Sequence, residues 1–127
     1  MSTQVIDREL ERLEDLWTDG LGEAYRSYLE AVGHFEPVAR QKLALAAALV
    51  EVGVRLQGLG GRAAPPPTLL MGDLCLARSS RLLADEAPQR VQVAFASAIE
   101  VMSSAAASGD AAPSAREMLL QALEAGR

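Results

Sequence analysis

The chain of 127 residues contains few aromatic side chains and a single cysteine. Phe, Trp and Tyr make up 4% of it, so the apolar half of the composition consists mostly of Ala, Leu and Val. This composition favours packed helices over a β-sandwich. The single cysteine, Cys75, cannot form an internal disulfide, which fits a reduced, cytoplasmic setting. The length suits one domain with its own core.

Positive charge and long apolar runs are also scarce. Lys and Arg number 12 against 17 for Asp and Glu, which gives a net charge of −5 and no basic patch for nucleic acid. The longest strongly apolar run, Leu43 to Val50, is too short to span a bilayer. Residues 1–16 are charged and periodic, unlike a signal peptide. We therefore expect a cytoplasmic protein with no membrane span and no nucleic-acid partner.

Helical periodicity runs through the chain and predicts an all-α, single-domain bundle of about six helices over residues 1–127. A Gly/Pro-rich connector at about 58–67 divides the third helix from the fourth. Thr68 is the predicted N-cap of the fourth helix, and Ser114 with Glu117 forms a capping box for the last. The predicted helices span about 3–19, 22–32, 36–57, 69–85, 88–107 and the residues that follow Ser114.

The third predicted helix differs in kind from the others, because it is apolar on every side between Leu43 and Val50. A helix of this type must be covered all round. In a domain this small, the helix is either central or partly covered by a partner chain.

Residues that could carry chemistry are few and scattered. The chain has no Asp-Asp pair, and the acidic group Glu14, Asp15 and Asp19 has the wrong spacing for Mg²⁺ and suits a solvated helix face. His34 has no Cys, His or paired acid near it in the sequence, so no metal role is expected. Cys75 has no His beside it and is expected to act as a small buried hydrophobe. We therefore expect no catalytic residue, metal ligand or cofactor on this chain.

The segment LLMGDLCLARSSRLL, Leu69 to Leu83, resembles the helix of trans-polyprenyl diphosphate synthases that carries a Gly-Asp step, here Gly72-Asp73. Those enzymes also need two aspartate-rich motifs of DDxxD type, which this chain lacks. The chain is therefore most similar to the small subunit of heterodimeric medium- and long-chain polyprenyl diphosphate synthases, over about residues 5–102. That resemblance implies a trimmed isoprenoid synthase fold.

The resemblance implies a non-catalytic regulatory subunit in quinone side-chain biosynthesis. A catalytic large subunit would hold Mg²⁺ and the diphosphates, and this chain would complete its fold and help set the prenyl chain length. Arg55 stands about where an aspartate of the first motif is expected, and it either contacts a diphosphate or a partner's acid, or is a surface arginine. The residues implied at the subunit interface or tunnel wall are Leu69, Met71, Gly72, Asp73, Leu74, Leu76 and Leu83.

Two other assemblies remain open from the sequence. The chain could form a homodimer when the large subunit is absent. It could instead be an independent homo-oligomeric helical scaffold or a lipid-binding module, which would use the same apolar helices for self-association. Copurification of a synthase with DDxxD motifs would separate these alternatives from the accessory subunit.

Overall fold

The computed structural model describes residues 20–56, 66–108 and 114–127, and these residues contain helices and no strand. The helices are α2 (Gly22–Leu29), α3 (Pro37–Leu56), α4 (Pro66–Glu86), α5 (Gln89–Ser108) and α6 (Ala115–Glu124). The predicted all-α, single-domain bundle is confirmed. The helix expected at 3–19 lies outside the described residues, so five of the six expected helices are seen here.

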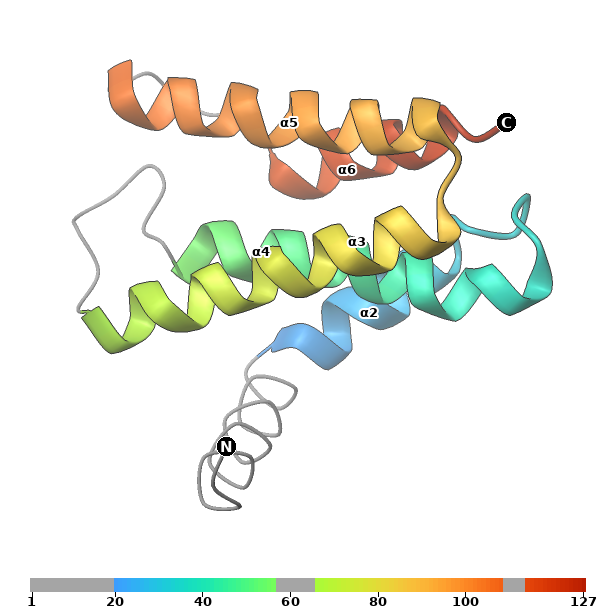
Figure 1. Cartoon of the computed structure of the whole chain (residues 1–127), viewed down its shortest axis with the longest axis horizontal. Helices are drawn as coiled ribbons and strands as arrows, with labels where there is room; N and C mark the ends of the chain where they lie inside the picture. The colour runs from blue at the N-terminus through green and yellow to red at the C-terminus, as the bar shows by residue number, and fades with distance from the viewer. Residues whose placement is uncertain (1–19, 57–65, 109–113) are drawn as a thin grey trace.

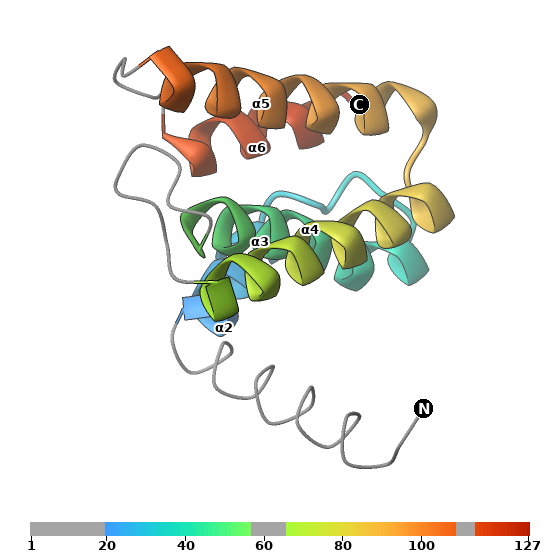
Figure 2. The same ribbon diagram turned by 60° about the vertical axis from the view of Figure 1, so that its left-hand side comes forward.

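The helices form two layers (Figures 1 and 2). One layer holds α2, α3 and α4, in which α3 and α4 make the most extensive pairing and α2 packs on α3. The other layer is the pair of α5 and α6, which lies over the first (Figure 1). Only Ala87 and Pro88 join α4 to α5, so the chain passes from one layer to the other in a single short turn.

The core is centred on α3. Its segment from Leu43 to Val50 is buried except for Leu45, which is partly buried. Helices α2, α4 and α6 of the same chain contact α3 and supply this cover. Of the two explanations for a helix that is apolar all round, the structure shows the first, because α3 is central.

Two predicted helix boundaries were wrong. Pro66 and Pro67, which were read as part of an extended connector, begin the fourth helix: α4 starts at Pro66, and Thr68 is inside it rather than its N-cap. Proline suits the first helical turn because its missing N–H has no partner there anyway. Helix α2 ends at Leu29, earlier than the predicted 22–32, and the turn that follows is held by Arg40, which donates to Phe35 O (2.9 Å).

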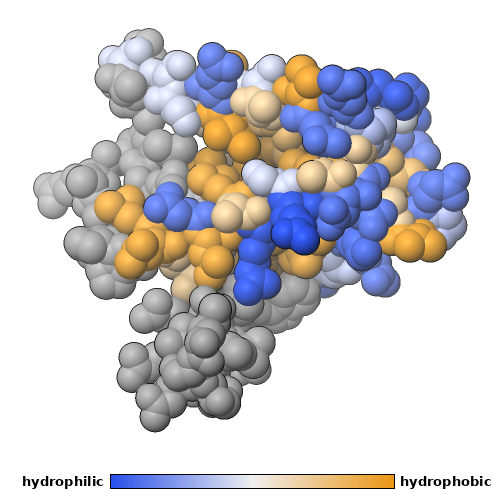
Figure 3. Space-filling view, viewed as in Figure 1, coloured by the Kyte–Doolittle hydropathy of each residue, from blue (hydrophilic) through white to orange (hydrophobic). Residues whose placement is uncertain are grey.

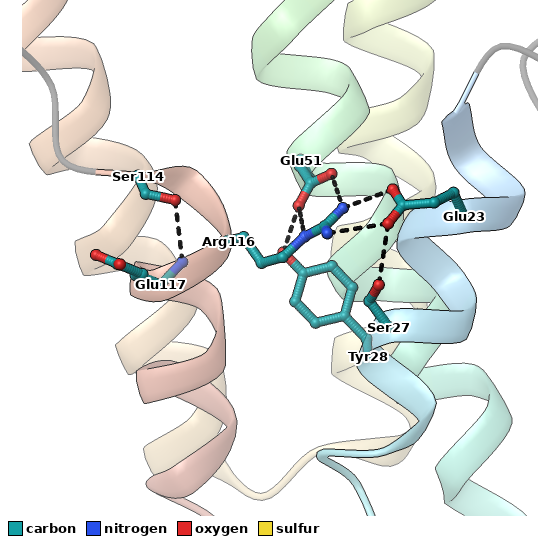
Figure 4. Close-up of polar contacts among 7 residues, drawn as sticks. All are labelled: Glu23, Ser27, Tyr28, Glu51, Ser114, Arg116 and Glu117. Carbon is teal, nitrogen blue, oxygen red and sulfur yellow. Dashed lines mark hydrogen bonds and ion pairs between the residues drawn. The ribbon is translucent and has the colours of Figure 1, made fainter.

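The last helix has the predicted N-cap. The Ser114 side chain accepts a hydrogen bond from the backbone N–H of Glu117, although the distance of 3.5 Å is long. This bond satisfies one of the backbone donors that the first helical turn leaves unpaired. The cap also places Arg116 in the first turn of α6, where its side chain meets α2 and α3 (Figure 4).

Candidate functional site

The Gly-Asp helix, α4, uses its inner side to pack on α3. Gly72, Cys75, Ser79 and Leu83 are buried at three- and four-residue spacing, and the Ser79 hydroxyl donates to Leu76 O (2.7 Å). The two helices pack closely at Gly53 of α3, where an added Cβ would be 3.2 Å from Gly72 O. Gly72 was expected to let another helix approach closely, and that helix is α3 of the same chain.

The outer side of α4 is apolar in its N-terminal half. Leu70 is 65% exposed, and Leu69 and Leu74 are partly buried. Asp73 lies exposed between them. Hydrophobic side chains gather over this half of α4 on the left of Figure 3.

The residues expected at an interface or tunnel wall therefore divide into two groups. Gly72 and Leu83 are buried within this chain, and Met71 and Leu76 are partly buried against its core. Leu69, Asp73 and Leu74 complete the set on the outer part of the helix. The structure brings these residues together on one helix and leaves only part of the set accessible to a partner.

Arg55 belongs to a different helix from these leucines. It lies in the last turn of α3, and its side chain is exposed. Its guanidinium rests against Gly20, because a Cβ added to Gly20 would be 3.1 Å from the Nη2 atom. Gly20 has φ +131°, a conformation that favours glycine. The arginine therefore comes close to the chain at a position that has no side chain.

A polar cluster that the sequence did not reveal joins the two layers (Figure 4). Arg116 of α6 donates to both carboxylate oxygens of Glu51 on α3 (2.9 and 3.0 Å) and to both of Glu23 on α2 (3.1 and 2.8 Å). Tyr28 donates its hydroxyl to Glu51 Oε1 (2.9 Å), and Ser27 donates to Glu23 Oε1 (3.2 Å). We call these five residues the Arg116 cluster. Bidentate pairs of this kind fix orientation as well as adding energy.

The electrostatics of the Arg116 cluster keep Arg116 and Tyr28 protonated. The hydrogen bonds that Arg116 donates to Glu51 and Glu23 raise its pKa further above its already high value. Burial and the neighbouring Glu51 carboxylate raise the pKa of Tyr28 far above neutrality. Neither group exchanges a proton near neutral pH, so the cluster is suited to holding helices together rather than to acid–base chemistry.

The pair of Arg116 and Glu23 predicts that the stability of the fold depends on pH in the acid range. The hydrogen bond from Arg116 holds the pKa of Glu23 below its ordinary 4.5. Its contribution to stability is therefore full above pH 4.5 and is lost as the pH falls through the lower folded-state pKa. We expect the thermal midpoint of the native chain to fall more steeply below pH 4.5 than that of Glu23→Gln. Thermal unfolding followed by circular dichroism across this range measures the difference, and parallel curves would contradict it.

The surroundings of Cys75 and His34 suit structural roles rather than catalysis or metal binding. The Cys75 thiol is buried as predicted, and burial raises its pKa, which opposes nucleophilic reactivity. His34 Nε2 donates to Leu123 O (2.9 Å) and so ties the turn after α2 to the end of α6. Its Nδ1 is buried, with no hydrogen-bond partner among the residues described.

Within ranges 20–56, 66–108 and 114–127, no three His, Cys, Asp or Glu side chains lie together as a metal site would need. The acidic group of Glu14, Asp15 and Asp19 lies outside these ranges. No helix in the described part of the chain is both long and apolar enough to cross a membrane.

Comparison of the chain with protein-family models, curated proteins and solved structures found no match.

Proposed function

We propose that this chain is a non-catalytic regulatory subunit of a heterodimeric polyprenyl diphosphate synthase. The observation that carries the proposal is the outer side of α4, where Asp73 of the Gly-Asp step lies beside the exposed Leu70 and the partly buried Leu69 and Leu74. Gly72 packs inward on α3, while Asp73 and Leu70 point away from the core. A partner that covers this side would bury apolar surface and meet one carboxylate, a pattern suited to a specific contact.

The proposed mechanism assigns the chemistry to the partner. The large subunit would supply Mg²⁺, the diphosphate sites and the reacting carbons. This chain would complete its fold, and Leu69, Leu70 and Leu74 would form part of the subunit contact or of the wall of the tunnel that receives the growing chain. Leucine side chains suit a hydrocarbon because they have no polar group to desolvate. Their bulk would limit the room for further isoprene units. Arg55, which is exposed, is the candidate for a polar contact with the partner or with a diphosphate.

Leu70→Glu tests this proposal at the most exposed leucine of α4. The tagged chain is purified gently from its own cell, its partner is identified, and the eluate is assayed for incorporation of isopentenyl diphosphate into long prenyl products. We expect a stoichiometric partner with two aspartate-rich motifs that is active only when this chain is present. Leu70→Glu is expected to weaken that association about 30-fold or more, because the new carboxylate would be buried unpaired at the contact.

Val38→Glu is the matched control. Val38 is 78% exposed in the first turn of α3, so the same substitution there adds a charge away from the N-terminal half of α4. It should leave copurification and activity unchanged. A chain that purifies without any such partner would overturn the proposal and favour the homo-oligomeric scaffold or lipid-binding module. If the two substitutions had equal effects, the outer side of α4 would not be part of the subunit contact.

A further inference from the structure

Helix α5 carries exposed valines and borders an apolar groove that it forms with α6. Val93 is 57% exposed and Val101 is 46% exposed on this helix. An open groove runs between α5 and α6 beside them, and its lining bears no charged group. The lining residues are Ala94, Ser97, Ala98, Val101, Met118, Gln121 and Ala122. The groove is shallow and its floor is built from alanines, so it suits a helix rather than a small molecule.

The exposed valines are placed symmetrically on α5. Val93 and Val101 lie four residues before and four residues after Ser97, so all three share one side of the helix. A two-fold axis through Ser97, perpendicular to α5, would place Val93 on Val101 of a second copy, and would do so twice. A symmetrical interface requires one patch that is complementary to itself, and this spacing supplies it.

The charges at the two ends of the groove have opposite signs. Arg90 donates to Ala125 O (2.7 Å), which shows that the start of α5 lies beside the end of α6. Arg127 lies at the same end but is paired with Glu124, so the positive charge of that end comes from Arg90. Glu100 and Glu117 lie toward the other end, because α5 and α6 run antiparallel. Figure 3 shows hydrophilic side chains gathered at the right-hand end of the upper layer, where α5 begins.

This charge pattern selects one arrangement of two copies. An antiparallel copy would bring the acidic end of one groove toward the basic end of the other, whereas a parallel copy would bring like charges together. Complementary ends of this kind favour the correct register and oppose the wrong one. The small side chains of Ala94 and Ser97 would let the two α5 helices approach closely.

We propose that the α5 side of the groove is the contact surface of a symmetrical homodimer, in which two copies of this chain cross antiparallel with Ser97 at the two-fold axis. The contact uses α5 and leaves the outer side of α4 accessible. It therefore does not depend on the proposed prenyl synthase partner, and the two proposals can fail separately.

Ser97→Cys tests the position of the axis in the purified chain. A residue on a two-fold axis faces its own copy, so the two introduced thiols would lie within the Cβ–Cβ distance of about 4 Å that a disulfide needs. Mild air oxidation should convert most of this variant to a covalent dimer at micromolar concentration, visible on a non-reducing gel. Ser103→Cys is the matched control, because it makes the same change at another exposed serine of α5 that does not line the groove. The native Cys75 is 1% exposed and does not compete.

Val101→Glu tests the surface without a cross-link. It places a carboxylate within the contact, about one helical turn from the axis, and should raise the dissociation constant of the dimer about 30-fold or more. Light scattering should then report a mass near 13.5 kDa where the native chain gives twice that value. The far-ultraviolet circular dichroism should not change, because Val101 is exposed in the single chain. A native chain that stays monomeric at about 100 μM, or equal cross-linking of Ser97→Cys and Ser103→Cys, would overturn the proposal.

Discussion

Replacing Arg116 by methionine is expected to lower the free energy of unfolding by about 2–3 kcal/mol. The Glu51 side chain is only 15% exposed, and the substitution would leave its carboxylate without its cation while Tyr28 still donates to it. The expected cost is set below that of a fully buried pair because Arg116 itself is 35% exposed. A chain of this size should then melt roughly 10 °C lower. Urea and thermal unfolding followed by circular dichroism measure both quantities.

Two further variants separate the contribution of the Arg116–Glu51 pair to stability from that of the Arg116–Glu23 pair. Glu23→Gln should cost less than Arg116→Met, since the Glu23 side chain is 62% exposed and water can replace the lost ion pair. The double variant Arg116→Met with Glu51→Leu should recover part of the loss, because it leaves no buried charge without a partner. If Arg116→Met unfolds within about 0.5 kcal/mol of the native chain, the cluster does not hold α6 to the first layer.

Gly53→Leu should destabilise the fold by about 3 kcal/mol or more, because α3 and α4 leave no room for a side chain at this position. A Cβ there would already be 3.1 Å from Leu76 Cγ and 3.2 Å from Gly72 O. The second atom belongs to the backbone of α4, so it can give way only if the helix moves. The better helix propensity of leucine offsets roughly 0.8 kcal/mol of this cost. Equilibrium unfolding in urea measures the net effect.

Gly33→Leu is the control for this substitution. Gly33 lies in the exposed turn after α2, and a Cβ there meets nothing within 4 Å. The change should stay within about 0.5 kcal/mol of the native chain. If Gly53→Leu is equally mild, the two helices are not held at the separation that the structure shows.

The sequence predicted the elements whose signal is local. Pro37 and Pro88 marked the starts of α3 and α5 to within one residue, and Ser114 with Glu117 marked the start of α6. The apolar residues on every side of α3 predicted a helix that is covered all round, and the structure showed that the cover comes from this chain. The start of α4 was wrong because proline is compatible both with an extended connector and with a first helical turn, and the sequence alone does not decide between them.

The Arg116 cluster could not be predicted, because no local signal connects its members. Arg116 is 65 residues from Glu51 and 93 residues from Glu23. Glu51 is the one hint, since it is a single acid in an otherwise apolar stretch of α3 and its side chain is largely buried. A carboxylate in that position requires a partner. The close packing of α3 on α4 at Gly53 was not predicted either, because the resemblance singled out Gly72 of α4 and not Gly53, the glycine opposite it on α3.

Arg116 is far from Glu23 and Glu51 along the sequence, and this has a consequence for how the chain folds. The pairs α3–α4 and α5–α6 connect neighbouring segments, so each can form early with little loss of chain entropy. The bonds from Arg116 to Glu23 and Glu51 close long loops, and we expect them to form after the main barrier has been crossed. Interactions absent from the transition state act on the rate of unfolding rather than on the rate of folding. Arg116 would then govern how long a finished molecule stays folded, and have little influence on how quickly it folds.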